Sequence, residues 1–245
     1  MQINPKTIKN HFEKSMEKYD ENAIVQNFLA ETLTKELSKI QSDFNNILEL
    51  GCGTGLLTKQ LSENVHYKTY TANDLTEKSK KYLTKYLKNF DYICGNAQKI
   101  KPSKSFDLIA SNAMFQWFTD LEEVLDKYRR FLNKYGILAF TTFSPENFQE
   151  LKTLTGLTLN YKTEAELEEI IGKNFEIIKI ESYKKVLEFN TPLELLYHMK
   201  NTGVNSLDNK KWDFSNVKDF CEKYNKTYDK VTLSYTPILV IARKK

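Results

Sequence analysis

The segment ELGCGTG, Glu49–Gly55, is the most informative part of this sequence. It follows a short apolar run, ILEL (Ile47–Leu50), which has the character of a buried strand. The glycines at positions 51, 53 and 55 let the backbone turn sharply and approach a ligand without an intervening Cβ. A strand, a glycine loop and a following helix together predict a nucleotide-type site in an α/β fold.

The spacing within the loop narrows the class of ligand. A dinucleotide fingerprint, G-x-G-x-x-G, would need a glycine where this chain has Leu56. The pattern here is G-x-G-x-G, with Glu49 two residues before the first glycine. We expect it to bind a nucleoside with a charged amino-acid tail, because Glu49 offers negative charge to an ammonium or a sulfonium. Asp74, in TANDLT, lies about 20 residues beyond the loop, the separation typical of a carboxylate that binds ribose hydroxyls.

Apolar periodicity predicts alternating strands and helices around this loop. We expect helices at Asn22–Ile40, after Gly55, across Tyr82–Phe90 and at Asp120–Asn133, and strands at Ile47–Leu50, His66–Ala72, Asp91–Gly95, Phe106–Ser111 and Gly136–Phe143. This alternation predicts a doubly wound, mainly parallel α/β sheet with helices on both faces.

The last third of the chain has a different pattern. Phe175–Phe189 and the end of the chain, VTLSYTPILVIARKK, are rich in β-forming residues. Between them TPLE (Thr191–Glu194) has the sequence of a helix start, with Thr at the N-cap, Pro next and Glu at the third helical position. We therefore expect a helical insertion at Thr191–Asp229, between the last two strands. The predicted organisation is one domain, residues 1–245: cap helices at 1–40, a core at 41–190, the insertion at 191–229 and a final strand at 230–245.

Composition excludes several other classes. Of 245 residues, 40% are hydrophobic and 28% are charged, and no apolar run approaches the roughly 20 residues of a membrane helix. Three cysteines and three histidines show no metal-ligand or disulfide spacing, so we expect no metal and a cytoplasmic location. The net charge of +4 is mostly scattered lysine, which does not predict nucleic-acid binding. The denser cluster Glu77–Lys88 is interpreted first as a solvated helix face and second as a site for an acidic partner.

The loop, Asp74 and GNA (Gly95–Ala97) together resemble the class I S-adenosylmethionine-dependent methyltransferases. Asn96 replaces the usual aspartate, and NKYG (Asn133–Gly136) replaces the usual P-G-G turn. The resemblance implies a seven-stranded Rossmann-like sheet with N-terminal capping helices, and S-adenosylmethionine as the cofactor. The cofactor-binding residues that it implies are Tyr19, Glu49, Gly51, Cys52, Gly53, Gly55, Asp74, Leu75, Asn96, Ala97, Ser111 and Gln116.

A narrower resemblance runs nearly end to end. His11–Ala23 resembles the N-terminal F-x-x-A-x-x-Y segment that covers S-adenosylmethionine in many small-molecule methyltransferases. Ser111–Leu121, Ala139–Phe143, His198–Leu207 and Ser234–Lys244 are similar to the malonyl-[acyl-carrier protein] O-methyltransferase family of biotin synthesis. This similarity implies an acyl-carrier protein as partner. Because such a carrier is acidic, Lys78, Lys80 and Lys81 are candidate docking residues, and we expect the enzyme to be a monomer. The substrate-binding residues that we expect from it are Tyr19, Gln116, Trp117, His198 and Lys200.

The expected chemistry needs no catalytic acid or base. A malonyl carboxylate, with an ordinary pKa around 4, is already ionised at neutral pH. Two alternatives stay open: another small-acid carboxyl methyltransferase of the trans-aconitate type, and a catalytically silent cofactor-binding partner subunit. A nucleic-acid base methyltransferase is disfavoured, because its [DNS]-P-P-[YFW] signature is replaced by SNAMF (Ser111–Phe115).

Overall fold

The computed structural model describes residues 4–203 and 214–245. Its strands are β1 (Asp43–Leu50), β2 (His66–Asp74), β3 (Asp91–Cys94), β4 (Phe106–Ser111), β5 (Leu132–Phe143), β6 (Phe175–Ser182), β7 (Lys185–Phe189), β8 (Val231–Tyr235) and β9 (Pro237–Lys244). Its α-helices are α1 (Pro5–Asn22), α2 (Ile24–Ile40), α3 (Leu56–Asn64), α4 (Lys80–Leu83), α5 (Leu121–Phe131), α6 (Gln149–Thr155), α7 (Glu164–Gly172), α8 (Pro192–Asn201) and α9 (Phe214–Thr227). Two 3₁₀ turns, η1 (Glu77–Ser79) and η2 (Phe115–Trp117), follow β2 and β4.

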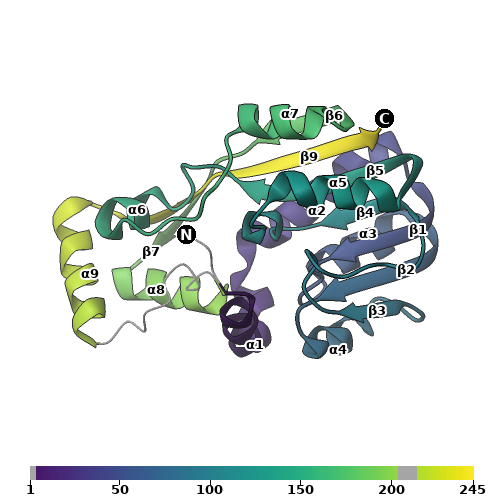
Figure 1. Ribbon diagram of the computed structural model, residues 1–245. Coiled ribbons are helices and arrows are strands. Elements are labelled where there is room, and N and C mark those ends of the chain that lie inside the picture. Colours follow the sequence, from purple (N-terminus) through teal and green to yellow (C-terminus); the bar gives the residue numbers. More distant parts are fainter. Residues whose placement is uncertain (1–3, 204–213) are drawn as a thin grey trace.

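Seven strands form one sheet in the order β3-β2-β1-β4-β5-β9-β6 (Figure 1). The first five strands are parallel, and β9 is antiparallel to both β5 and β6. The order reverses direction between β1 and β4, which is the topological switch point of a doubly wound sheet. The predicted fold class is confirmed, and the glycine loop follows β1 at that switch point.

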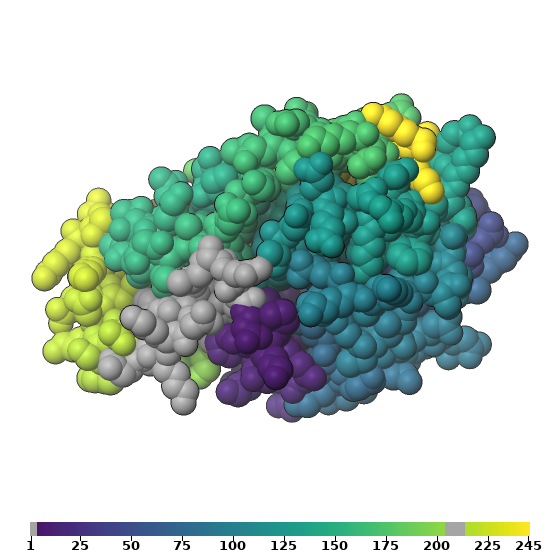
Figure 2. Space-filling model, in the orientation of Figure 1, coloured from purple at the N-terminus to yellow at the C-terminus, as the bar shows by residue number. Residues whose placement is uncertain are grey.

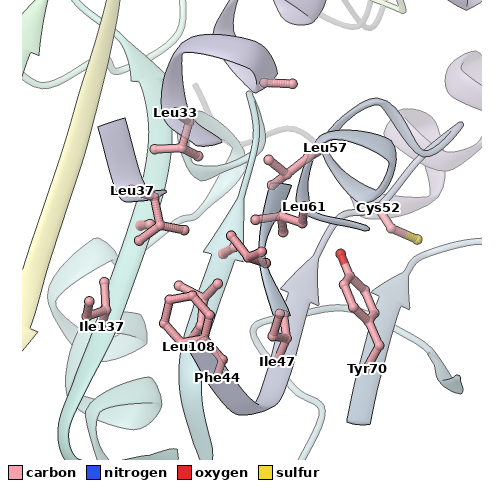
Figure 3. Packing of buried hydrophobic residues seen from close by; sticks show 14 of the residues in the cluster. Leu33, Leu37, Phe44, Ile47, Cys52, Leu57, Leu61, Tyr70, Leu108 and Ile137 are labelled. Atoms are coloured by element: carbon pink, nitrogen blue, oxygen red, sulfur yellow. The ribbon is translucent and has the colours of Figure 1, made fainter. Parts of the chain in front are cut away.

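Successive side chains of a pleated strand point to opposite faces of the sheet, so the apolar residues of each strand contribute to two cores, one on each face. Ile47 of β1 packs with Leu33 and Leu37 of α2 and with the leucines of α3 (Figure 3). The next residue, Leu48, belongs to the cluster on the opposite face, beneath α5 and α7. Both faces of the sheet are therefore covered, and ligands can reach it only at its edges.

The insertion is larger than the pattern predicted. Phe175–Phe189 is broken into β6 and β7, and the chain end is broken into β8 and β9. β7 and β8 pair with each other in a separate two-stranded sheet, and α8 and α9 lie between them in the chain (Figure 1). The segment that leaves the large sheet therefore begins at β7 rather than at Thr191. Residues 204–213 of the predicted helical insertion lie outside the described residues.

The TPLE interpretation is confirmed at the start of α8. The backbone N–H of Glu194 donates to the Thr191 hydroxyl at 3.2 Å, and the Asn190 N–H donates back to the Glu194 carboxylate at 2.9 Å. These bonds satisfy two backbone N–H groups that would otherwise lack partners near the helix start.

Other predicted elements differ in length; β1, for example, begins at Asp43 rather than at Ile47. The helix expected across Tyr82–Phe90 is the single turn of α4, followed by turns in which Lys85 N–H donates to Tyr82 and Tyr86 N–H donates to Leu83. Leu83 and Leu87 are nevertheless buried, so the apolar spacing reflects packing rather than a continuous helix. β5 begins at Leu132, four residues before the predicted start, because the residues given to the end of α5 already belong to the strand.

A buried carboxylate joins the two-stranded sheet to α6. Glu150 is 7% exposed and accepts bonds from the Ser234 N–H at 3.0 Å, the Ser234 hydroxyl at 2.7 Å and the Thr232 hydroxyl at 3.2 Å. Hydrogen bonds to a charged acceptor are stronger than neutral ones, and removing the acceptor leaves buried donors unpaired.

Glu150→Ala is expected to lower the free energy of unfolding by about 2 to 3 kcal/mol, because three donors lose one buried acceptor. Urea denaturation followed by circular dichroism measures this loss. Glu168→Ala, on the exposed face of α7, should stay within about 0.5 kcal/mol of wild type. Equal losses in the two variants would contradict the anchoring role of Glu150.

Candidate cofactor and substrate site

One cavity lies along the carboxyl edge of the large sheet. Residues after β1, β2, β3, β4 and β5 line it, together with residues of α1 and Tyr235 at the end of β8. Ligands of open α/β sheets bind at this edge, beside the switch point. Of the residues predicted for the cofactor, Tyr19, Glu49, Gly51, Cys52, Gly53, Asp74, Leu75, Asn96, Ala97 and Gln116 line the cavity.

The glycine loop packs closely against neighbouring side chains, at positions where a Cβ would not fit. Gly51 and Gly53 have φ of +67° and +56°, in the left-handed region. A Cβ on Gly51 would lie 2.7 Å from Met114 Cγ, and one on Gly53 would lie 3.0 Å from Phe12 Cζ. Gly55 differs from the prediction: with φ of +91° it is the N-cap of α3 and does not line the cavity.

Glu49 is a buried acid beside this loop, with only 1% of its surface exposed. Its Oε2 accepts bonds from the Thr58 hydroxyl at 2.6 Å and from the Tyr70 hydroxyl at 2.5 Å. Burial raises the pKa of Glu49 to about 7, with these two bonds opposing the rise. The carboxyl group can therefore ionise in response to a cationic ligand near neutral pH.

Asp74 connects the end of β2 to the glycine loop. One carboxylate oxygen accepts the Gly53 N–H at 2.9 Å, and the other accepts the Thr76 N–H at 3.1 Å. An ionised carboxylate offers about four lone-pair positions, so it can accept more than one hydrogen bond on each oxygen, as the predicted ribose contact requires. Burial raises the pKa of Asp74, and both backbone bonds oppose that shift. Asp74 thus has two roles, because it shapes the loop and also faces the ligand cavity.

Asn96 and Ala97 follow β3 at the next position along the edge. Asn96 Oδ1 accepts the Gln98 N–H at 2.9 Å. This bond fixes the amide, so the NH₂ group of Asn96 remains available as a donor to a ligand. The Ala97 carbonyl accepts bonds from Tyr128 and Lys127, so this turn is fixed from below by α5. A fixed donor beside an apolar surface is suited to the edge of an adenine ring.

Helix α1 lies at the surface of the molecule (Figure 2), and its residues line the cavity together with the loops at the carboxyl edge. Phe12 and Tyr19 share one face of the helix, with ring centroids 5.2 Å apart. Asp20 accepts a bond from the Thr54 hydroxyl at 2.5 Å, and Glu13 accepts one from the Thr76 hydroxyl at 2.5 Å. The helix is thereby tied to the loops after both β1 and β2, and Tyr19 is brought into the cavity as predicted.

The loop after β4 carries strain and unpaired polar atoms. Ala113 has φ of +52°, held by its N–H donating to the Thr141 hydroxyl at 2.8 Å. Gln116 Nε2 donates to the Ala113 carbonyl at 2.6 Å, which leaves Gln116 Oε1 buried without a partner among the described residues. Gln26 Oε1 is in the same state, and both side chains line the cavity. Two orphaned acceptor oxygens fit a cationic ligand that carries N–H donors, such as an amino-acid ammonium.

Three more predicted residues, in addition to Gly55, lie outside the cavity lining. Ser111 is fully buried and its hydroxyl donates to the Leu50 carbonyl at 2.8 Å, so it joins β4 to β1. Lys200 is exposed on α8, a placement that does not support a contact with the substrate. His198 is buried, its Nε2 lies 2.7 Å from the Tyr235 hydroxyl, and burial lowers its pKa to about 4. It is therefore neutral near pH 7 and contacts Tyr235, a placement that does not support the predicted substrate contact.

Several residues at the far end of the cavity were missed by sequence reasoning. Asn147, Tyr161 and Tyr235 line it together with the predicted Trp117. Asn147 follows β5, so its position after a strand end was a usable clue. Tyr161 and Tyr235 belong to the loop before α7 and to β8, and only the fold brings them to this edge.

The raised pKa of Glu49 predicts that binding of S-adenosylmethionine, the expected cofactor, depends on pH. The sulfonium and ammonium of the cofactor favour the ionised Glu49 carboxylate, so binding should release a proton. The affinity for the cofactor should therefore rise up to about tenfold from pH 6 to pH 8. Calorimetry in buffers of different ionisation enthalpy measures both quantities. Glu49→Gln should lose this dependence, and Glu63→Gln, exposed on α3, should keep it. Identical profiles in Glu49→Gln and wild type would contradict the assignment.

Comparisons with known proteins agree with this geometry. Residues 48–140 match the family described as "Methyltransferase domain". The chain is 37% identical over 241 residues to a malonyl-[acyl-carrier protein] O-methyltransferase of Calditerrivibrio nitroreducens, covering 97% of this chain and 96% of the relative. It is 32% identical to the enzyme of that name from Haemophilus influenzae, covering 98% and 95% of the two chains.

Solved structures share the fold at low sequence identity. A methyltransferase structure from Bacillus halodurans has a TM-score of 0.63 and 17% identity, covering 86% of this chain and 98% of that one. N-methyltransferase NodS from Bradyrhizobium japonicum, in complex with S-adenosylhomocysteine, has a TM-score of 0.55 and 14% identity, covering 87% and 85%. With the glycine loop, Asp74 and the full-length relatives, these matches show that the chain is an S-adenosylmethionine-dependent methyltransferase and belongs to the malonyl-[acyl-carrier protein] O-methyltransferase family.

Proposed function

We propose that this protein methylates the free carboxylate of malonyl-[acyl-carrier protein], giving the methyl ester and S-adenosylhomocysteine. The observation that carries the proposal is the similarity to relatives of that name over nearly the whole of both chains. The cavity supports the proposal. It extends from the predicted cofactor-binding residues at the ends of β1, β2 and β3 to a second region, lined by aromatic residues, beyond the end of β5.

S-adenosylmethionine, when bound, supplies a methyl group on a positively charged sulfur. A carboxylate oxygen of the substrate forms the new O–CH₃ bond as the S–CH₃ bond breaks, and the sulfur keeps that bond's electron pair. No proton moves, so no general base is required. The chain's own contribution is to hold the oxygen in line with the methyl group and to exclude water from the two opposite charges that disappear.

Cytoplasmic location and a monomeric state stay predictions for this enzyme. Cys52, Cys94 and Cys221 are all unpaired by disulfides, which is consistent with a reducing compartment. Within the described ranges, no helix is long and apolar enough to cross a bilayer.

Two other functions are distinguishable by experiment. A small-acid methyltransferase of the trans-aconitate type would use the same cofactor residues and would act without a carrier protein. A silent partner subunit would bind the cofactor without methyl transfer, but the intact loop, Asp74 and the second cavity region favour an enzyme.

Incubation with methyl-labelled S-adenosylmethionine tests the proposal directly. Malonyl-carrier protein should take up label that mild base releases as methanol, because the product is an ester, and acetyl-carrier protein should take up none. Label transferred to free polycarboxylic acids such as trans-aconitate, but not to the malonyl carrier, would identify the small-acid alternative. Cofactor binding with no labelled acid at all would identify the silent subunit.

The three lysines predicted for carrier docking differ in their surroundings. Lys78 Nζ lies 3.0 Å from a Glu13 carboxylate oxygen, so this lysine is already paired with α1. Lys80 and Lys81 are exposed beside the carboxyl edge, where an acidic carrier could approach the cavity. We propose these two as the electrostatic contacts, because exposed charges of opposite sign accelerate association.

Lys80→Glu is expected to raise the KM for malonyl-carrier protein several-fold at about 0.05 M salt, with kcat little changed, and the difference should shrink by about 0.3 M salt as charges are screened. Steady-state kinetics at both ionic strengths measure this effect. Lys134→Glu, exposed at the amino end of β5, is the matched control and should behave as wild type. A KM that is independent of salt and of Lys80 would exclude docking through this residue.

A further inference from the structure

The cavity follows the order of the strand ends. Asn96 and Asp74 lie after β3 and β2, the glycine loop after β1, and Asn112 and Ala113 after β4. A nucleoside held by Asp74 would have the loop after β4, across the switch point, as the neighbouring place for its amino-acid tail. The part of the cavity beyond that tail, at the end of β5, is the place left for a second substrate.

Tyr161 presents a hydrogen-bond donor in this second region. Asn147 Oδ1 accepts the Thr236 N–H at 3.1 Å, which fixes the orientation of the amide. Asn147 Nδ2 consequently donates to the Tyr161 hydroxyl oxygen at 3.1 Å. The hydroxyl proton is not used in that bond, and among the residues that the structure describes none accepts it. Burial raises the pKa of Tyr161, so the hydroxyl keeps this proton at neutral pH.

The surroundings of Tyr161 are apolar and poor in cations. Phe143 and Phe148 line the same region, and their rings lie 6.2 and 4.7 Å from that of Tyr235. Across the described part of the cavity lining, Lys9 on α1 is the one cation, and it lies 3.9 Å from a Glu13 carboxylate oxygen. A buried carboxylate still needs hydrogen-bond donors, because leaving it without partners costs several kcal/mol.

We propose that the Tyr161 hydroxyl, oriented by the positioning residue Asn147, donates a hydrogen bond to the substrate carboxylate, and that this neutral donor selects the acid. The inference rests on the proposed function and names the residue that recognises its substrate. A neutral donor suits the reaction, because the carboxylate loses its charge in the transition state. An arginine would stabilise the ionised ground state more than the transition state, and would thereby slow the transfer.

Binding in a dead-end complex tests this assignment without turnover. With S-adenosylhomocysteine at saturation, affinity is measured for malonyl-carrier protein and for acetyl-carrier protein, which lacks the carboxylate. Tyr161→Phe should reduce the preference for malonyl at least tenfold, and should leave the affinity for S-adenosylhomocysteine within about twofold. Tyr135→Phe, exposed at the opposite end of β5, should keep the full preference.

Asn147→Asp separates positioning from packing. The aspartate keeps an oxygen for the Thr236 N–H, but its other oxygen takes the Tyr161 proton and repels a carboxylate. It should lose the malonyl preference while retaining acetyl-carrier affinity. A residue with only a structural role would weaken both carriers equally, and that result would overturn the proposal.

The binding measurements also distinguish a failure of the Tyr161 assignment from a failure of the proposed function. A wild-type protein that prefers malonyl, with Tyr161→Phe showing the same preference, contradicts the role of Tyr161 alone. A wild-type protein that shows no preference for malonyl contradicts the proposed function and this inference together.

Discussion

The hydrogen bonds of the Asp74 carboxylate to the N–H groups of Gly53 and Thr76 are the contacts on which the site depends. They join the loops that follow the two neighbouring strands β1 and β2, and so fix the shape of the carboxyl edge at the switch point. Helix α1 then packs on these same loops through Asp20 and Glu13. The Asp74 carboxylate therefore joins the two loops on which α1 packs.

Charge is distributed unevenly along the cavity. The cofactor half contains Glu49 and Asp74, both buried acids whose pKa values are raised by burial. A cationic cofactor stabilises their ionised forms, so each acid favours its binding. The far half, around Tyr161 and Tyr235, is lined by aromatic rings and neutral donors. This contrast suits a reaction in which a positive sulfur and a negative oxygen both become neutral. The acids stabilise the cationic cofactor, and the neutral donors bind the carboxylate without stabilising its charge as strongly as a cation would.

Features that local chemistry determines were predictable from the sequence. Gly51, Gly53 and Asp74 were identifiable because glycines directly after a buried strand, with a carboxylate about 20 residues further on, form a pattern that nucleoside binding requires. Features that depend on long-range packing were missed or misplaced. Tyr235 reaches the cavity because β8 pairs with β7 outside the large sheet, and Tyr161 reaches it from the loop before α7. Lys200 and His198 were predicted to bind the substrate, but α8 exposes the first and buries the second against Tyr235.

The cofactor and the acid are expected to lie in sequence along the carboxyl edge, from β3 and β2 to β5. A crystal structure of the protein with S-adenosylhomocysteine and a non-reactive malonyl thioester analogue would show whether they do. We expect ribose hydroxyls on Asp74, the sulfur between the glycine loop and Gln116, and a malonyl oxygen within hydrogen-bond distance of the Tyr161 hydroxyl. A ribose bound away from Asp74, or a malonyl carboxylate paired with a lysine or an arginine at the surface, would contradict this arrangement.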